Sequence, residues 1–137
     1  MSNLKVPEES YYTKNHEWLS VDENIVTVGI TEYAAHNLGE IVYVDLPEEG
    51  DRISINSFFS SLESPKKIMD LVGAFGGTIL EVNSRIYDNP GLINDDPYGE
   101  GWIFIAEMEN EKDLAQLMRA PQYKTYISQL SAPENIT

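Results

Sequence analysis

Short runs of apolar and β-branched residues recur along the chain, and turn-forming residues separate them. The runs lie at residues 25–30, 41–46, 52–62, 68–72, 78–82 and 102–106. Residues 47–51 and the pair Gly76-Gly77 supply turn chemistry between them. Short strands with a turn about every ten residues are typical of antiparallel sheets that pack face to face or form a flattened barrel. The pattern therefore predicts a mainly β domain.

Helical patterns occur in two places. Thr31 is suited to cap a helix over residues 32–38, and Gly39 is suited to end it. Residues 111–130 carry apolar side chains at helical spacing, and Pro121 interrupts them. We therefore expect two consecutive short helices in that region, with their apolar faces packed on the sheets.

The composition adds a strong acidic bias to this picture. Nine Lys and Arg stand against 23 Asp and Glu, so the net charge is −14. Phosphate backbones and anionic membranes repel such a chain, which argues against nucleic-acid and membrane partners. No apolar run approaches the roughly 20 residues of a membrane helix, and residues 1–10 lack the pattern of a signal or transit peptide. We therefore expect a cytoplasmic protein whose partners are proteins with basic patches.

Few side chains suited to catalysis are present. The chain has no cysteine, which excludes disulfides, cysteine nucleophiles and thiolate metal sites, and it has two histidines, His16 and His36. The common hydrolase, metalloprotease and phosphate-loop motifs do not occur. Carboxylates are abundant, but no pair of them is singled out for catalysis. The sequence favours a non-catalytic protein with no metal site.

The segment Ser64-Pro65-Lys66-Lys67 is unusual because two of the nine basic residues are adjacent in it. Serine at the first position and proline at the second are favoured in a type I turn, and strand-like sequence lies on both sides. We expect the tip of a β-hairpin with the Lys66 amine in water. Taken alone, such a lysine is most often only a solvated charge.

Several sequence blocks occur in one order from about residue 11 to residue 127. Residues 12–18 read YTKNHEW, residues 28–34 read VGITEYA, residues 38–47 read LGEIVYVDLP, and GLIN and DPYGEGW occupy 91–94 and 96–102. They resemble the patterns YTKxHEW, VGITxYA, LGxIVxVxLP and LVN…DPYGEGW of the glycine cleavage H-protein family. Gly50, Glu63, Asp70 and Gly77 also lie at the offsets from Lys66 that are found in the family's lipoyl-attachment segment.

The resemblance implies a carrier protein and not an enzyme. The implied fold is a flattened lipoyl/biotinyl-type barrel-sandwich hybrid of two antiparallel sheets, with a short internal helix and C-terminal helices. This domain would cover residues 11–130, between a flexible N-terminus (1–10) and a flexible tail (131–137). An amide would join lipoate to Lys66, and the cofactor would supply the sulfur chemistry that a cysteine-free chain lacks.

The resemblance also implies a set of partners. The lipoyl arm would take the aminomethyl group of glycine from a pyridoxal-phosphate glycine decarboxylase and offer it to a tetrahydrofolate-dependent aminomethyltransferase. Dihydrolipoamide dehydrogenase would then reoxidise the arm, and a lipoate-attaching enzyme would install it. Such a tether raises the effective concentration of the arm at each docked enzyme.

Other residues receive expected roles from the same resemblance. The residues expected to serve recognition by the lipoate-attaching enzyme are Glu63, Asp70, Gly50 and Gly77. The two glycines are expected above all to permit tight turns. Glu17 and Asp70, with His16 nearby, are expected to form a surface cleft that holds the amine of the loaded arm, because carboxylates pair with amines.

The chain departs from the family pattern at the attachment segment itself. The family usually reads ESVKAASD where residues 63–70 read ESPKKIMD. Pro65 stiffens the tip, Lys67 is a second candidate acceptor although the register favours Lys66, and Ile68 and Met69 add apolar surface. Two alternatives therefore stay open. One is a lipoyl carrier for another pathway, such as sulfur oxidation with a heterodisulfide-reductase-like system or lipoyl relay, and the other is an unmodified binding paralogue.

Overall fold

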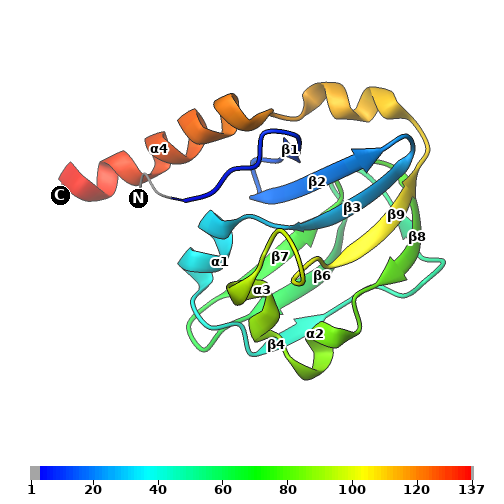
Figure 1. The fold of residues 1–137 in the computed structure, drawn as a ribbon, viewed down its shortest axis with the longest axis horizontal. Helices are drawn as coiled ribbons and strands as arrows, with labels where there is room; N and C mark the ends of the chain where they lie inside the picture. Colours follow the sequence, from blue (N-terminus) through cyan, green and yellow to red (C-terminus); the bar gives the residue numbers. More distant parts are fainter. Residues whose placement is uncertain (1–3, 137) are drawn as a thin grey trace.

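Two antiparallel β-sheets form the body of the protein (Figure 1). The computed structural model describes residues 4–136, and side chains are described for residues 4–130. In sheet order, the six-stranded sheet consists of β1 (Tyr11–Tyr12), β2 (Glu17–Asp22), β3 (Ile25–Ile30), β9 (Phe104–Met108), β8 (Gly77–Val82) and β5 (Arg52–Ile53). The three-stranded sheet consists of β4 (Tyr43–Asp45), β6 (Phe58–Glu63) and β7 (Ile68–Val72). This confirms the predicted two-sheet antiparallel fold.

One hydrophobic core joins the two sheets. Buried residues of the large sheet, such as Leu19, Val28 and Phe104, pack in the same cluster as Leu62 and Leu71 of the small sheet. No strand pair links the two sheets within the described residues, so the fold is a sandwich and not a closed barrel. Alternate side chains of a strand point to the same face of its sheet, so the apolar side chains on the inner faces of the two sheets pack against each other.

Helix α1 (Glu32–Leu38) confirms the predicted capped helix. The Thr31 hydroxyl accepts a hydrogen bond from the N–H of Ala34 at 3.2 Å. Gly39 ends the helix at φ 80°, and its N–H donates to the carbonyl oxygen of Ala35 at 3.2 Å. A positive φ is costly for residues with a Cβ, which explains the glycine.

The chain beyond β8 contains more helix than the sequence predicted. Two short helices, α2 (Arg85–Asp88) and α3 (Gly91–Asp95), precede β9. A 3₁₀ helix, η1 (Glu111–Gln116), and then α4 (Ala120–Ile136) follow it. The two consecutive helices expected over residues 111–130 are therefore present, but the break lies before Ala120 and not at Pro121. Pro121 lies in the first turn of α4, where a missing N–H costs no hydrogen bond.

Helix α4 packs beside β1, the edge strand of the large sheet. Its residues Ala120, Tyr123 and Ile127 share a buried cluster with Tyr12 and Trp18. Its backbone continues through most of the segment expected as a tail, and residue 137 lies outside the described residues. The expected flexible N-terminus lies partly outside them too, at residues 1–3. None of the described helices combines the length and the apolar character that crossing a bilayer requires.

Candidate functional site

The β6–β7 hairpin confirms the predicted turn around residues 64–67. Glu63 pairs with Ile68, and the N–H of Ser64 donates to the carbonyl oxygen of Lys67 at 2.9 Å. The Ser64 hydroxyl, in a residue that is 8% exposed, accepts from the backbone N–H groups of Lys67 at 3.1 Å and Lys66 at 3.4 Å. Pro65 has no N–H to satisfy. The serine side chain therefore holds the tip from inside the turn.

The two adjacent lysines at this tip differ in their contacts. Both side chains are exposed. The ammonium of Lys67 donates to the carbonyl oxygen of Asn37 at 3.1 Å. The side chain of Lys66 forms neither a hydrogen bond nor an ion pair with any residue in the described part of the chain. The Lys66 amine is therefore the one open to a reagent in solution.

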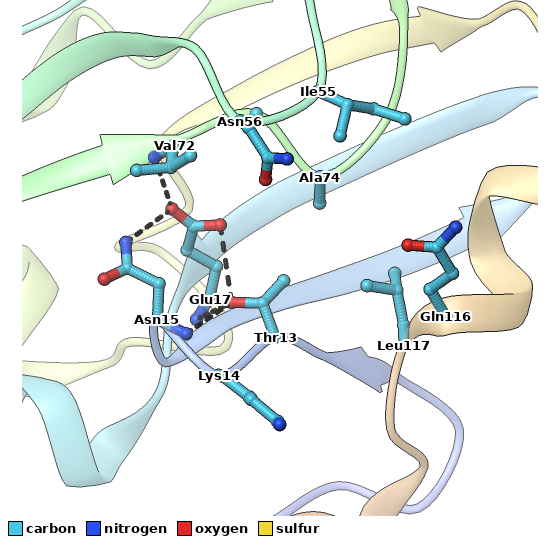
Figure 2. A pocket seen from close by; sticks show the side chains of 11 residues that line it. Thr13, Lys14, Asn15, Glu17, Ile55, Asn56, Val72, Ala74, Gln116 and Leu117 are labelled. Carbon is cyan, nitrogen blue, oxygen red and sulfur yellow. Dashed lines mark hydrogen bonds between the residues drawn. The ribbon is translucent and has the colours of Figure 1, made fainter.

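A cleft of about 290 Å³ lies beside the far end of β7 (Figure 2). Four separate segments of the chain line it. They contribute Thr13, Lys14, Asn15, Glu17, Ile55, Asn56, Val72, Gly73, Ala74, Gln116 and Leu117. The lining combines apolar groups with a carboxyl group, amides and one lysine, so it can hold an apolar chain that ends in a polar group.

Glu17 supplies the carboxyl group of this cleft (Figure 2). The side chain is 2% exposed and accepts hydrogen bonds from the Val72 N–H at 2.8 Å, the Asn15 amide at 3.1 Å and the Thr13 hydroxyl at 3.5 Å. Burial raises the pKa of Glu17 to about 7, although these hydrogen bonds act in the opposite direction. Near neutral pH the group can therefore exist as either a proton donor or an anion.

The turn before β2 places Glu17 at the cleft. The Thr13 hydroxyl accepts from the N–H groups of Asn15 and Glu17, at 3.1 and 3.2 Å. The Asn15 amide also donates to the carbonyl oxygen of Asp70 at 2.9 Å, which ties this turn to β7. Sequence reasoning did not single out Thr13 or Asn15, although both lie in the block that carries Glu17.

Asp70 and His16 lie outside the cleft lining. Asp70 is exposed on β7, and its backbone, not its carboxylate, contacts Asn15. The His16 ring lies 2.9 Å from the Tyr123 hydroxyl through Nδ1, and it packs on the rings of Tyr33 and Tyr126 at centroid distances of 4.8 and 5.7 Å. Burial lowers the pKa of His16, which favours its neutral form. This ring helps to fasten α4 next to the turn that carries Glu17.

The two candidate glycines meet different backbone requirements. Gly50 adopts φ 90°, a conformation that L side chains rarely adopt. Gly77 begins β8, where an added Cβ would lie 2.2 Å from the carbonyl oxygen of Glu107 on β9. Gly50 lies just before β5 and Gly77 is the first residue of β8, and both strands belong to the large sheet. Glu63, in contrast, is the residue directly before the hairpin tip. The glycines therefore have a structural reason to be present regardless of any contact with a partner.

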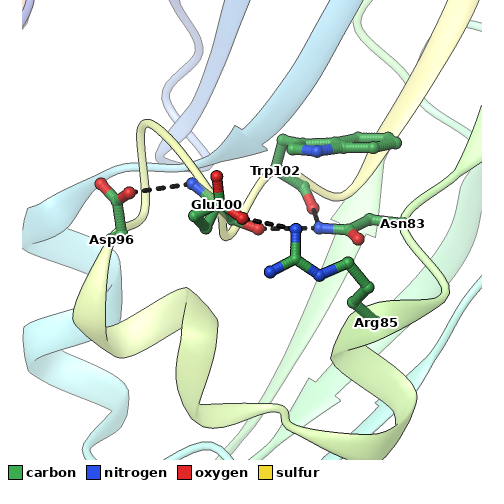
Figure 3. A network of polar contacts seen from close by, with 5 residues as sticks. All are labelled: Asn83, Arg85, Asp96, Glu100 and Trp102. Carbon is green, nitrogen blue, oxygen red and sulfur yellow. Dashed lines mark hydrogen bonds and ion pairs between the residues drawn. The ribbon is translucent and has the colours of Figure 1, made fainter.

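The DPYGEGW block forms a loop that a polar network holds (Figure 3). Asn83 is 2% exposed, and its amide donates to the carbonyl oxygens of Glu100 at 2.9 Å and Trp102 at 2.7 Å. The Asp96 carboxylate accepts from the Glu100 N–H at 2.9 Å, and Arg85 pairs with the Glu100 side chain at the surface. The block thus has a structural role: it connects α3 to β9.

Comparisons with known proteins agree on one family. A family model described as Glycine cleavage H-protein matches residues 10–130. The chain is 42% identical to glycine cleavage system H protein 4 of Aquifex aeolicus, over 94% of this chain and 75% of that protein. It is 40% identical to the glycine cleavage system H protein of Halothermothrix orenii, over 93% of this chain and 99% of that protein.

A solved structure shows the same fold. The crystal structure of a glycine cleavage system H protein from Mycobacterium marinum matches with a TM-score of 0.82 and 33% identity, covering 92% of this chain and 99% of that chain. The residues that the family model matches, 10–130, include the hairpin tip and the cleft. The chain belongs to the glycine cleavage H-protein family, whose members are non-catalytic carriers with a lipoate joined to a lysine.

Proposed function

We propose that Lys66 is the residue to which lipoate is joined in this carrier of the glycine cleavage system. The observation that carries the proposal is the Lys66 amine, which is exposed at a hairpin tip and forms neither a hydrogen bond nor an ion pair with the described residues. The tip also occupies the position of the attachment lysine in the family pattern. Amide formation needs an amine that an acyl donor can approach, and the tip meets that requirement.

The attachment step is an acyl transfer to Lys66. The Lys66 Nζ attacks the carboxyl carbon of an activated lipoyl donor that the lipoate-attaching enzyme supplies. A C–N bond forms, the bond from that carbon to the activating group breaks, and the nitrogen loses a proton. When bound, lipoate supplies a dithiol–disulfide pair that the cysteine-free chain does not possess.

We propose that the cleft beside β7 receives the arm that starts at Lys66. Strand β7 leads from the tip to Val72 in the cleft lining, a path of six residues or roughly 20 Å along an extended chain. We assign Glu17 the role of binding the amine of the loaded arm, because an ionised carboxylate pairs with a cationic amine. Asp70 lies between the tip and the cleft and adds negative charge, while His16 supports the turn that carries Glu17.

The proposed partners are the enzymes of the glycine cleavage reaction. We infer that a pyridoxal-phosphate glycine decarboxylase, an aminomethyltransferase and dihydrolipoamide dehydrogenase dock in turn around the hairpin in the cytoplasm. Glu63 and Asp70 flank the tip and are the charges a basic partner surface would meet first, together with the net charge of −14. The same acids would guide the lipoate-attaching enzyme.

A tryptic peptide map of protein from its own cell tests the attachment site. Trypsin does not cut after an acylated lysine, so lipoate on Lys66 yields a modified peptide of residues 53–67. Lipoate on Lys67 yields a modified peptide of residues 67–85 instead. We expect only the modified peptide of residues 53–67, and we expect this modification to be absent from a Lys66→Arg variant. An unmodified chain would refute the proposal and leave a binding paralogue.

A further inference from the structure

Lys67 connects the hairpin tip to a helix that is distant in the sequence. Its side-chain nitrogen lies 3.1 Å from the carbonyl oxygen of Asn37, in the last turn of α1. The family pattern usually has alanine at this position, and an alanine could not make the contact. The attachment hairpin of this chain thus has a link to α1 that follows from its own sequence.

The end of α1 offers a suitable acceptor for a cation. The last carbonyl groups of a helix have no partner within it, and they carry a partial negative charge. Two nearby carbonyls are already used: Ala35 accepts from the Gly39 N–H at 3.2 Å, and Gly39 accepts from the Asn94 amide at 2.8 Å. The Asn37 carbonyl accepts the ammonium of Lys67. Lys67 therefore acts as a side-chain cap for the end of α1.

This contact distinguishes two adjacent lysines that are both candidate acceptors in the sequence. The Ser64 hydroxyl holds the backbone N–H groups of both lysines, so the two share one rigid turn. Within that turn, the Lys67 amine must leave the Asn37 carbonyl before it can attack an acyl donor. The Lys66 amine has no such contact to break within the described residues.

We propose that Lys67 is a positioning residue that holds the hairpin tip against the end of α1 and so presents Lys66 as the lipoyl acceptor. The inference rests on the proposed function, because it concerns the same attachment step. The Lys67 cation fixes the tip while the acyl donor is aligned with Lys66. Loss of this link leaves the acceptor intact and makes its placement less well defined, which slows capture by the attaching enzyme.

The test measures lipoylation of the purified, unmodified full-length chain by a lipoate-attaching enzyme with lipoate and ATP, followed by intact mass. Lys67→Met keeps the side-chain stem and removes the donor, and we expect kcat/KM to fall about three- to fivefold. Lys67→Arg restores a cation and should regain most of the rate. Lys124→Met, which removes an exposed lysine on α4, is the matched control for lost charge and should keep the wild-type rate.

Two further measurements distinguish the role of Lys67 from the proposed function. In a Lys66→Arg variant, the modified peptide of residues 67–85 should not form, because the Lys67 amine remains at α1. The carbonyl ¹³C chemical shift of Asn37, measured without lipoate, should change in Lys67→Met and stay in Lys66→Met. Equal rates for Lys67→Met and wild type, transfer of lipoate to Lys67, or an unchanged Asn37 shift would each overturn the role of Lys67. A wild-type chain that accepts no lipoate on either lysine would instead refute the proposed function.

Discussion

Replacement of Glu17 with glutamine removes one buried charge from the cleft wall and keeps the shape of the side chain. The Val72 N–H and the Asn15 amide donate to the same carboxyl oxygen, and a glutamine carbonyl can accept both hydrogen bonds. The Thr13 hydroxyl donates to the other oxygen at 3.5 Å and already accepts from two backbone N–H groups, so a glutamine amide loses this one long hydrogen bond. The substitution therefore removes the charge and keeps the two shorter hydrogen bonds.

The ionised Glu17 carboxyl opposes folding. Burial raises its pKa from 4.5 to about 7, so below about pH 4 both the folded and the unfolded chain hold the proton. Between these two pKa values the folded chain keeps a proton that the unfolded chain has released, so the free energy of unfolding falls as pH rises. Each pKa unit corresponds to about 1.4 kcal/mol, so above pH 7 this group costs the fold about 3 kcal/mol.

Urea unfolding at about pH 4.5 and about pH 8 measures this cost in the wild type and in Glu17→Gln. We expect similar stabilities at the lower pH and a variant that is more stable by about 3 kcal/mol at the higher pH. Glu81→Gln, at an exposed position on β8, is the control and should show the same difference from wild type at both pH values. A wild type more stable than Glu17→Gln at about pH 8 would show that the three hydrogen bonds outweigh desolvation, which refutes the reasoning.

Three other predictions concern the fold and docking. Gly77→Ala places a Cβ 2.2 Å from the Glu107 carbonyl oxygen, and we expect thermal unfolding to show a loss of about 2–3 kcal/mol. Gly91→Ala is the control, since its nearest contact would be 3.5 Å, and an equal loss there would contradict the argument. Asn83→Ala leaves two carbonyl oxygens without their donor, and urea unfolding should show that it lowers the free energy of unfolding by about 2–3 kcal/mol. The control Arg85→Ala, at an exposed ion pair, should lower it by less than about 1 kcal/mol. Equal losses in the two variants would count against a structural role of the network. The rate at which dihydrolipoamide dehydrogenase reoxidises the reduced lipoyl arm should fall as salt rises, and a salt-independent rate would rule out electrostatic steering.

Local signals in the sequence were sufficient for the elements whose ends and faces are determined nearby. Thr31 and Gly39 mark the two ends of α1, and both act there as the cap geometry requires. Residues 64–67 form a hairpin tip because serine and proline favour the turn and strands flank it. The ordered blocks from residue 11 to residue 127 indicated the family, and the comparisons confirm it.

Elements that depend on distant partners were missed. Strand β2 begins with the three consecutive buried residues Glu17, Trp18 and Leu19, so its sequence shows no simple alternation. Helices α2 and α3 are too short to be stable alone, and Asn83 and neighbouring contacts hold the loop that follows them. Pro121 reads as a helix breaker in any local pattern, but the tertiary structure places it in the first turn of α4.

The sequence by itself determined the fold class, the family and the hairpin, because these follow from residue spacing, turn chemistry and blocks of motif. Only the tertiary structure decided which side chains share the cleft, since Glu17, Ile55, Val72 and Leu117 come from four separate segments. The sequence register already favoured Lys66, and the tertiary structure added a physical difference between the two lysines. The Lys67 amine contacts the last turn of α1, 30 positions away in the chain. Packing sets the burial of Glu17, so its raised pKa too depends on neighbours that no local pattern specifies.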